Sequence, residues 1–526
     1  MMADDLPRVA AERWPGHVQH VRPAGGAGAE LTCDRDVLVE VCRWLVATRE
    51  LSFAGLVVEE GVRDWWLRYV FYGAARDGWV HVLAQAPLDD RTFPSIVGVT
   101  HGANWHEREA EDLYGVRFAG HPHLGDFILH DDAWQEGVEP MRHGFSASTP
   151  ISVRQPNTDW RPGRILQAPG AFAMPLGPVF AGITEPAHYL LETVGEDVVR
   201  AIPRLFYKYR GIEKLAEGRT ADDVLLLAER FSATTAFAHA LAYCRALEAI
   251  GEIEVPARAM VLRTFVAELE RFRHHVGAIE AICESTGLVV WASQAALLEE
   301  DLLRVSGALT GHRYLFGLCV PGGLATDLAD AACRAAAATC AGVLERLQGL
   351  ERMLQRSSSF LDRLEEVGFI SHDDAIAFGL VGPIARASGV SRDLRRVLPD
   401  GDYDQLAFDV PVEQEGDGYA RLRLLFAETR QSVRLMEQEV ARLPAAPVRV
   451  AVPRRGGAAM GWVEAPRGAA FHWVRLHDDG TVARYHIITP SFTNWLGFRL
   501  SVENFSFQDF PIILSTLDLS AAENDR

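Results

Sequence analysis

The stretch ARAMVLRTFVAELERFRHHVGAIEAICEST, residues 257–286, decides the fold class of this chain. Its apolar residues recur at spacings of three and four, which is the period of one face of an α-helix. Three further segments have the same spacing, and glycines and prolines separate them. Long helices packed against one another predict a large bundle. The three further segments are Thr220–Ile250, Ala292–Thr310 and Asp327–Val367.

The residues that precede this bundle predict a smaller domain of mixed helices and strands. A helix is expected first, because apolar residues have helical spacing over Val37–Leu51. Three runs rich in β-branched and aromatic residues follow, and a short helix is expected between Asp89 and Val97. The three predicted strands are Leu56–Glu60, Trp65–Tyr72 and Trp79–Gln85.

Composition divides the chain into four parts. Residues 1–33 are read as an N-terminal extension and residues 34–134 as the small domain. Residues 135–172 are rich in Pro, Gly, Ser and Arg, which is typical of a linker. Residues 173–526 form the large domain, whose end, Val448 to Leu517, is expected to consist of short strands and turns. The predicted fold class is α+β: a small α+β domain, then a large, mainly helical domain with short peripheral strands.

Charge and cysteine usage exclude several classes of protein. The net charge of −19 would repel nucleic acid, so no nucleic-acid partner is expected. The 7 cysteines occur singly, with no C-x-x-C pair, which argues against a disulfide framework and against a four-thiolate metal site. We find no signal peptide and no apolar run of the roughly 18 residues that a membrane span needs. Any membrane association is therefore expected to come through partners.

A dense charged motif lies in the small domain: Trp105-His-Glu-Arg-Glu-Ala-Glu-Asp-Leu-Tyr-Gly115, with His121-Pro122 after it. It resembles the signature of the small hydrophilic subunit of respiratory complex I. Glu107, Arg108, Glu109 and Asp112 are too densely charged to form an apolar core. They predict a hydrogen-bonded ion network at an interface; the alternative is a solvated helix face.

The large domain carries a second resemblance, from about Pro175 to Arg526. Its motifs occur in the order found in the large subunit of membrane-bound NiFe hydrogenases and in its relative, the quinone-site subunit of complex I. With the small domain in front, the chain resembles fused subunits such as the formate hydrogenlyase large subunit. The motifs are Pro175-Leu-Gly-Pro178, Glu185-Pro-Ala-His188, Arg210-Gly-Ile-Glu-Lys214, Phe237-Ala-His-Ala240, Val255-Pro-Ala-Arg258, Gly382-Pro-Ile-Ala-Arg-Ala-Ser-Gly389, Glu464-Ala-Pro-Arg-Gly468 and Leu517-Asp518.

The active centre of that family is degenerate in this chain. The resemblance implies two C-x-x-C pairs that hold nickel and iron, since soft thiolates suit those metals. Ser232 and Thr235 stand at the first pair, and Ser520 and Glu523 at the second. The chain is therefore expected to bind no NiFe centre and no other metal. The four side chains are expected to form hydrogen bonds with one another and with Arg467.

Other pocket positions are assigned through the same resemblance. Glu185 and His188 match an element that carries protons, and a buried Glu near a His can act as a relay because burial raises its pKa toward neutrality. The alternative for them is a structural hydrogen bond. Arg467 matches an arginine over the metal; without a metal it is expected to pair with Glu185, Asp518 or Glu523. The quinone-contacting positions match Phe180 and Ala233, whose side chains cannot donate a hydrogen bond.

The resemblance implies a function for the whole chain. It predicts a hydrophilic core subunit, peripheral on the cytoplasmic side of the cell membrane, in a complex that couples electron transfer to ion translocation. The expected partners are an iron–sulfur small subunit, which would hold the iron–sulfur clusters, and antiporter-like membrane subunits. Two alternatives remain open: a subunit of an NADH- or ferredoxin-linked quinone oxidoreductase, which would make quinone a ligand of an altered pocket, and a non-catalytic assembly scaffold.

Overall fold

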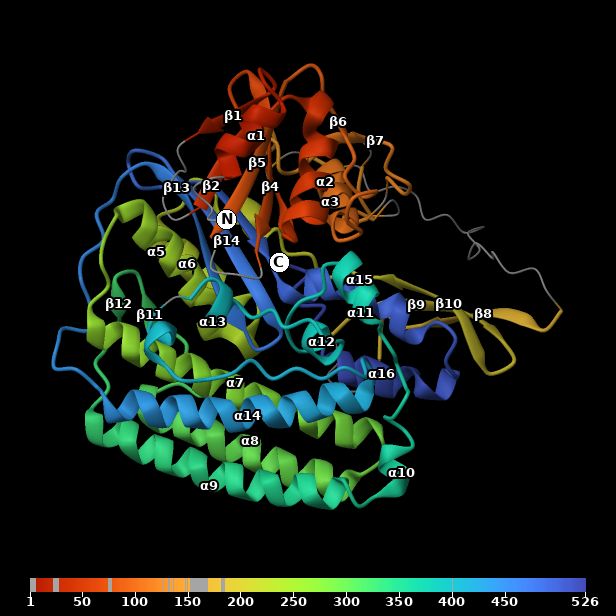
Figure 1. The fold of residues 1–526 in the computed structure, drawn as a ribbon, viewed down its shortest axis with the longest axis vertical. Coiled ribbons are helices and arrows are strands. Elements are labelled where there is room, and N and C mark those ends of the chain that lie inside the picture. Colours follow the sequence, from red (N-terminus) through yellow and green to blue (C-terminus); the bar gives the residue numbers. More distant parts are fainter. Residues whose placement is uncertain are drawn as a thin grey trace.

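A five-stranded sheet and the helices on one of its faces form the small domain in the computed structural model (Figure 1). The structure describes residues 6–21, 28–73, 78–125, 127–130, 133–135, 137–146, 148, 150–151, 169–180, 185–399 and 401–526. The sheet has the order β1-β2-β5-β4-β3, and β2 and β5 are its parallel pair. Its strands are β1 (Val18–Val21), β2 (Gly28–Cys33), β3 (Ser52–Glu60), β4 (Asp64–Tyr72) and β5 (Trp79–Pro87).

The helices of the small domain agree with the sequence in one case and correct it in another. Helix α2 (Leu38–Arg49) is the predicted first helix. The short helix expected between Asp89 and Val97 is wrong: this segment contains β6 (Thr92–Pro94), which pairs with β7 (Arg117–Ala119). Pro94 explains the error, because proline disfavours helical backbone in the residue before it. The charged motif itself forms α3 (Ala103–Tyr114).

The predicted N-terminal extension is also corrected. Residues 6–21 and 28–33 are not separate from the small domain, because they supply α1 (Leu6–Arg13) and the strands β1 and β2. Leu6, Ala10 and Trp14 are buried in the same cluster as α2. The predicted linker, 135–172, lies largely outside the described residues, which resume at residue 169 with β8.

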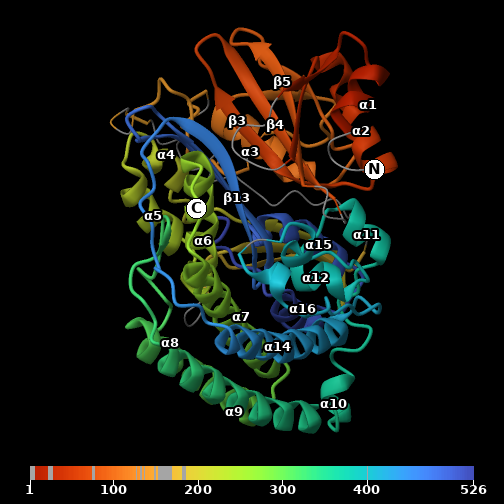
Figure 2. The same ribbon diagram turned by 60° about the vertical axis from the view of Figure 1, so that its left-hand side comes forward.

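Long helices form the bundle of the large domain (Figures 1 and 2). Helix α7 packs against α6, α8 and α14, and α9 packs against α8 and α14. The predicted helix Thr220–Ile250 is interrupted at Ser232–Thr235, and the one predicted over Asp327–Val367 ends at Leu354. The bundle helices are α5 (Ala221–Arg230), α6 (Ala236–Gly251), α7 (Ala257–Ser285), α8 (Val289–Thr310), α9 (Asp330–Leu354) and α14 (Gly418–Ala441), of which α14 was not predicted.

Short helices and strands surround the bundle. A three-stranded sheet of β8 (Ala171–Leu176), β9 (His188–Val194) and β10 (Asp197–Arg204) projects from its side (Figure 1). The C-terminal part contains strands, as predicted, but also two helices that the expectation of turns missed. The remaining elements are α4 (Ile212–Ala216), β11 (Cys319–Val320), β12 (Gly323–Leu324), α10 (Ser358–Leu361), α11 (His372–Ala377), α12 (Gly382–Ala387), α13 (Leu394–Val397), β13 (Gly457–Ala465), β14 (Gly468–Leu476), β15 (Val482–Ile488), α15 (Pro490–Val502) and α16 (Phe510–Leu517).

The two domains share one continuous interior. The small-domain sheet buries one face against α2 and α3 and the other against the β13–β15 sheet, where Trp79 meets Phe471 edge to face. On its far side, β13 packs directly on α6. Gly461 permits this close approach, because a Cβ there would lie 1.9 Å from the Ala242 carbonyl oxygen. The β13–β15 sheet therefore fixes the small domain over the segment that opens α6.

Candidate functional site

Two segments far apart in the chain meet in one buried pocket. Ser232 and Thr235 lie just before α6, and Ser520 and Glu523 follow α16. The Ser232 and Thr235 hydroxyl oxygens are 2.7 Å apart, and both donate to the Glu523 carboxylate, at 3.3 and 3.2 Å. The Ser520 hydroxyl accepts from the Glu523 backbone N–H. The four positions that the sequence grouped by resemblance therefore form one hydrogen-bonded cluster, in which Glu523 is fully buried.

Arg467, in the turn between β13 and β14, closes this cluster. Its guanidinium lies 3.2 Å from the Glu523 carboxylate and 3.2 Å from that of Asp518, and it also donates to the Asp518 carbonyl. Burial opposes ionisation of both carboxyls, but the Arg467 charge outweighs it. The pKa of Asp518 falls to about 2, and the pKa of Glu523 lies well below its usual range. The pocket thus holds one cation between two carboxylates, the arrangement expected for Arg467 without a metal.

Behind Glu523 lies a chain of buried rings that the sequence did not reveal. His239 of α6 lies 3.9 Å from Glu523, and its Nδ1 is 3.1 Å from Nε2 of His472 on β14. The other nitrogen of His472 is 2.7 Å from the Tyr485 hydroxyl on β15. Burial lowers the pKa of His472 well below its usual value and raises that of Tyr485. His472 and Tyr485 belong to strands whose alternation predicts burial but not these partners.

Helix α7 holds the first pocket segment in place through two residues that sequence reasoning also missed. The Glu270 carboxylate accepts from the backbone N–H groups of Phe237 and Ala238, which open α6. Arg273 donates to the carbonyl of Thr234. These bonds satisfy backbone groups at a helix N-terminus that have no partner within the helix. In the sequence, these two residues fall only within the helical periodicity of residues 257–286, which predicts the helix but not these contacts.

The proton-relay hypothesis for Glu185 and His188 assumed that burial raises the pKa of the carboxyl, and the structure does not bury Glu185. Glu185 is exposed and accepts hydrogen bonds from the Ser520 hydroxyl and from the backbone N–H of Ala522. These hydrogen bonds hold the second pocket segment in place. A structural hydrogen bond is the role that the sequence left as the alternative to a proton relay. His188 begins β9, opposite Arg204 on β10. Burial, and then the Arg204 charge, lower the pKa of His188.

The structure also shows the surroundings of the two positions matched to quinone contacts and of the adjacent histidines of α7. Phe180 lies beside Tyr189, and Ala233 is exposed in the turn before α6. The neighbouring His274 and His275 bind different carboxylates, those of Asp518 and Glu428. Within the described residues, no three His, Cys, Asp or Glu side chains converge as a metal site would require.

The charged motif of α3 has more than one structural role. Glu107 is buried inside the small domain, where its carboxyl accepts from the Ser95 hydroxyl at 2.6 Å and from the Ile96 N–H. Asp112 accepts from the backbone N–H groups of Ile128 and Leu129, and Arg108 lies over the Phe127 ring. Through these contacts the three residues hold the segments that pack around α3 within the small domain.

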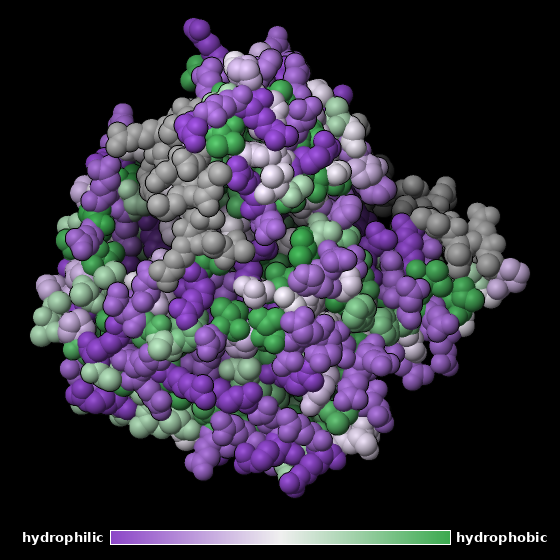
Figure 3. All heavy atoms as spheres, in the orientation of Figure 1, coloured by the Kyte–Doolittle hydropathy of each residue, from purple (hydrophilic) through white to green (hydrophobic). Residues whose placement is uncertain are grey.

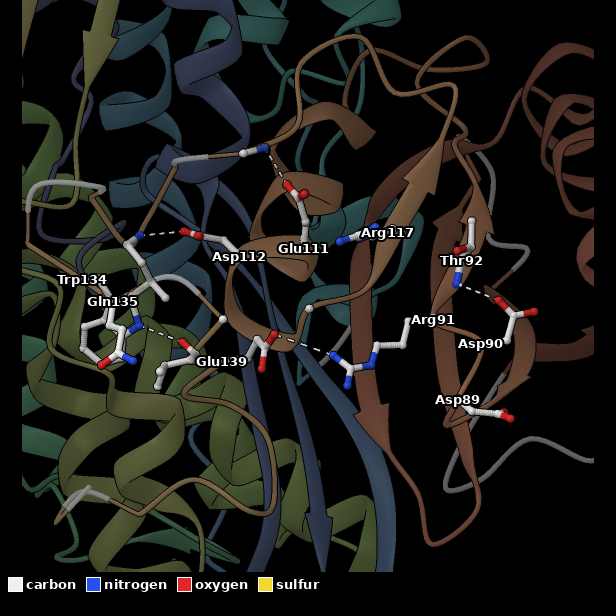
Figure 4. Close-up of a pocket in the computed structure, with 15 residues that line it drawn as sticks. Asp89, Asp90, Arg91, Thr92, Glu111, Asp112, Arg117, Trp134, Gln135 and Glu139 are labelled. Carbon is white, nitrogen blue, oxygen red and sulfur yellow. Dashed lines mark hydrogen bonds and ion pairs between the residues drawn. The ribbon is translucent and has the colours of Figure 1, made fainter. Parts of the chain in front are cut away.

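Figure 4 shows Asp112 beside Glu111 at the end of α3, where a cleft of about 720 Å³ opens. Glu111 accepts from the Gly125 N–H, and Arg91 pairs with Glu139 across the cleft at 3.7 Å. The charges in this cleft are thus engaged mainly with the protein itself.

Glu109 is the motif residue that crosses to the large domain. Its carboxylate lies 2.6 Å from Nη2 of Arg526, whose Nε lies 3.1 Å from the Glu213 carboxylate. Arg526 is fully buried between the two domains. Burial opposes ionisation of Glu213, but the charges of His486 and Arg526 outweigh it and lower its pKa. The predicted ion network at an interface is therefore present at this position, between two parts of the same chain.

Glu107 gives a pH prediction, because burial raises its pKa to about 7. Between about pH 4.5 and 7 the folded state binds the proton that the unfolded state releases, so stability falls as pH rises through that window, by about 3 kcal/mol. Glu107→Gln keeps an acceptor for the Ile96 N–H and does not ionise. We expect this variant to be more stable than the unaltered chain at pH 8 and nearly equal to it at about pH 4, below the window. Denaturant unfolding at both pH values measures the difference, and a pH-independent difference would contradict it.

Comparison with known proteins agrees with this geometry. Models of the 30 kDa and 49 kDa subunits of respiratory-chain NADH dehydrogenase match residues 31–150 and residues 289–456 and 450–526. A nickel-dependent hydrogenase model matches residues 210–277. Formate hydrogenlyase subunit 5 of Escherichia coli (strain K12) is 30% identical over 85% of this chain and 79% of its own length. The chain belongs to the family of formate hydrogenlyase subunit 5 and the fused C/D subunits of NADH-quinone oxidoreductase.

Other members of this family match over similar lengths. Hydrogenase-4 component G of Escherichia coli (strain K12) is 29% identical over 87% of this chain and 80% of its own. The fused C/D subunit of NADH-quinone oxidoreductase from Methylococcus capsulatus is 26% identical over 93% of each chain. A solved chain of the membrane-bound sulfane sulfur reductase, an archaeal respiratory membrane complex, has a TM-score of 0.65 and 28% identity; the match covers 69% of this chain and 100% of that one. In the described part of this family member, no helix has the length and apolarity to cross a membrane.

Proposed function

We propose that this chain is a peripheral core subunit of a membrane-bound respiratory complex of the complex I and energy-converting hydrogenase kind, and that it carries no NiFe centre. In this proposal the chain helps to couple electron transfer to ion translocation through its partner subunits. The observation that carries the proposal is the closed cluster of Ser232, Thr235, Ser520, Glu523 and Arg467.

The donor set of the pocket does not fit a NiFe centre. Nickel and iron of that kind take soft thiolate ligands, whereas the four positions offer three hydroxyl oxygens and one carboxylate. Hydroxyls of Ser and Thr are protonated near neutral pH, and here they donate to Glu523. The nearest cysteine in sequence, Cys244, is fully buried on α6, nine residues beyond Thr235, or roughly 13 Å along a helix. No step of a reaction is therefore assigned to nickel.

The partners and the location of the chain are part of the same proposal. We infer an iron–sulfur small subunit, which would hold the clusters that carry electrons, and antiporter-like membrane subunits that would move ions. The names of the relatives, which include a subunit of a quinone oxidoreductase and a respiratory membrane complex, support a place beside other subunits in a membrane complex. We place the chain on the cytoplasmic side of the membrane, held there by these partners.

One preparation tests both halves of the proposal. We expect the chain, purified from membranes of its native host in mild detergent, to bring with it an iron–sulfur protein and membrane subunits identified by mass spectrometry. Elemental analysis of the same sample should give iron but less than about one tenth of a nickel per chain, and hydrogen should not reduce an artificial dye. Stoichiometric nickel would refute the pocket assignment, and a chain that purifies alone would refute the subunit assignment.

A further inference from the structure

A groove of about 580 Å³ on the large domain, away from the pocket of Glu523, has an unusual concentration of arginine for a chain of net charge −19. It lies between α14 and the segment that leads from α13 to residue 411 (Figure 1 labels both helices). Among the described residues, three arginines and one aspartate supply its charged lining. They are Arg396, Arg430, Arg434 and Asp409.

The residues of one wall occupy a single face of α14. Ala427, Arg430, Gln431 and Arg434 follow the spacing i, i+3, i+4, i+7, so their side chains emerge side by side. Arg430 is engaged, because it lies 2.7 Å from the Glu351 carboxylate. Arg434 is exposed, and none of the contacts among the described residues gives its guanidinium a hydrogen bond or an ion pair. One arginine of this wall therefore faces solvent with its charge uncompensated.

The opposite wall is formed by Arg396 and Phe408. The Arg396 guanidinium lies 4.0 Å from the centre of the Phe408 ring, a cation–π contact that orients the arginine and leaves its charge in place. Within the described residues, this ring is the one partner found for the Arg396 side chain. Asp409, which is exposed, is the only carboxylate in the described lining, so positive charge prevails in the groove.

The two walls are held at a fixed separation before any ligand arrives. The Gln438 side chain of α14 makes two hydrogen bonds to the backbone of Ala407, one to its N–H at 2.9 Å and one to its carbonyl at 3.0 Å. Phe408 is buried in a small apolar cluster with Leu435 of α14. A groove fixed in this way binds a ligand without first ordering its walls.

Gln431 supplies an observation independent of the charges. It lines the groove, is 9% exposed, and its side-chain nitrogen is buried with no hydrogen-bond partner among the described residues. A buried donor without a partner costs about 1–3 kcal/mol, and a ligand acceptor would remove that cost. Figure 3 shows that much of the face seen in Figure 1 is hydrophilic. In the groove, Gln431 adds an unsatisfied amide donor to the arginines.

We propose that this groove binds a small molecule through a phosphoryl group, held by Arg396, Arg430 and Arg434 with a hydrogen bond from Gln431. A phosphoryl group carries up to two negative charges and three acceptor oxygens, which matches several guanidinium groups better than a single carboxylate does. The volume lies in the range of small-molecule sites. Phe408, Pro411 and Ala427 give the groove an apolar portion for the rest of the ligand. The site is separate from the proposed function and does not depend on the metal content of the pocket.

Titration calorimetry of the full chain with inorganic pyrophosphate tests the proposal. We expect binding with a Kd below about 1 mM at low salt, weakened at least about tenfold by about 0.5 M NaCl, because salt screens the guanidinium charges. Arg434→Ala should weaken binding about tenfold, the loss expected for one charge-assisted hydrogen bond. Gln431→Leu should weaken it without lowering thermal stability. The matched control is Arg334→Ala, which removes an exposed arginine from α9 and should leave the affinity unchanged.

A parallel measurement separates the two sources of phosphoryl groups. Vesicles of phosphatidylglycerol, tested by co-sedimentation with the same chain, should bind it no more strongly than neutral vesicles do. Binding to the anionic vesicles without binding to pyrophosphate would overturn the proposal, as would equal affinities for Arg434→Ala and Arg334→Ala. Absence of any heat with the unaltered chain at low salt would overturn it too.

Discussion

Replacing Arg467 by methionine should destabilise the large domain by about 3–5 kcal/mol, the cost of leaving a buried charge without its partner. Methionine keeps most of the aliphatic volume of the arginine but offers no donor to Glu523 and Asp518. Glu523 is fully buried, and the Arg467 charge is the main cause that holds its pKa well below the usual range. Without the arginine, burial opposes ionisation of this carboxyl, so its charged form becomes costly. Urea unfolding followed by tryptophan fluorescence measures the loss.

A second substitution distinguishes between lost electrostatic attraction and lost packing as the cause of the destabilisation. Adding Glu523→Gln to Arg467→Met should recover more than half of the lost stability, because the neutral amide needs no cation. Arg454→Ala is the control, since Arg454 pairs with Asp222 in an exposed position and should contribute nothing measurable. A loss below about 1 kcal/mol for Arg467→Met, or no recovery in the double variant, would mean that Arg467 does not stabilise the cluster electrostatically.

Reversing the charge of Glu109 by Glu109→Lys should loosen the small domain from the large one, with a loss of at least about 3 kcal/mol. The new ammonium group would lie beside Arg526, which would lose its 2.6 Å contact, and close to Arg484. Both arginines are buried, so solvent cannot screen the repulsion. Calorimetry should show the small domain unfolding in a separate, earlier transition, whereas the unaltered chain unfolds its two domains together.

The control for this experiment is Glu345→Lys. Glu345 lies exposed on α9 and makes none of the hydrogen bonds found among the described residues, so its reversal changes the net charge equally without touching the interface. Its unfolding profile should match that of the unaltered chain. If Glu109→Lys unfolds like this control, Arg526 does not join the two domains.

Local patterns predicted a large part of the fold. The apolar spacing of residues 257–286 is repeated along the chain, and α7 begins at Ala257 and ends at Ser285, within one residue of the predicted range. Helix α2 and strands β3 to β5 follow from the same kind of evidence. The failures are equally specific: Pro94 changed an expected helix into β6, and the predicted helix Thr220–Ile250 breaks at Ser232–Thr235, where Glu270 of α7 accepts from the first backbone N–H groups of α6.

The residues of the candidate site were likewise predicted only in part. The resemblance of motifs selected Ser232, Thr235, Ser520, Glu523 and Arg467, and the structure brings these residues together. It did not select Glu270, His472 or Tyr485, whose roles depend on neighbours contributed by other elements. Glu185 shows the converse, because the motif suggested a buried relay and the structure leaves the side chain exposed.

The sequence by itself determined most helices of the bundle, though not α14, and it determined the family motifs and the absence of thiols at the four pocket positions, since each is a property of residue types and their spacing. Only the tertiary structure decided which charges meet. Ser232 reaches Glu523 across 291 residues of chain, and Arg526 reaches Glu109 across 417. The energy of such a contact depends on how deeply both groups are buried, and burial is set only when distant segments pack together.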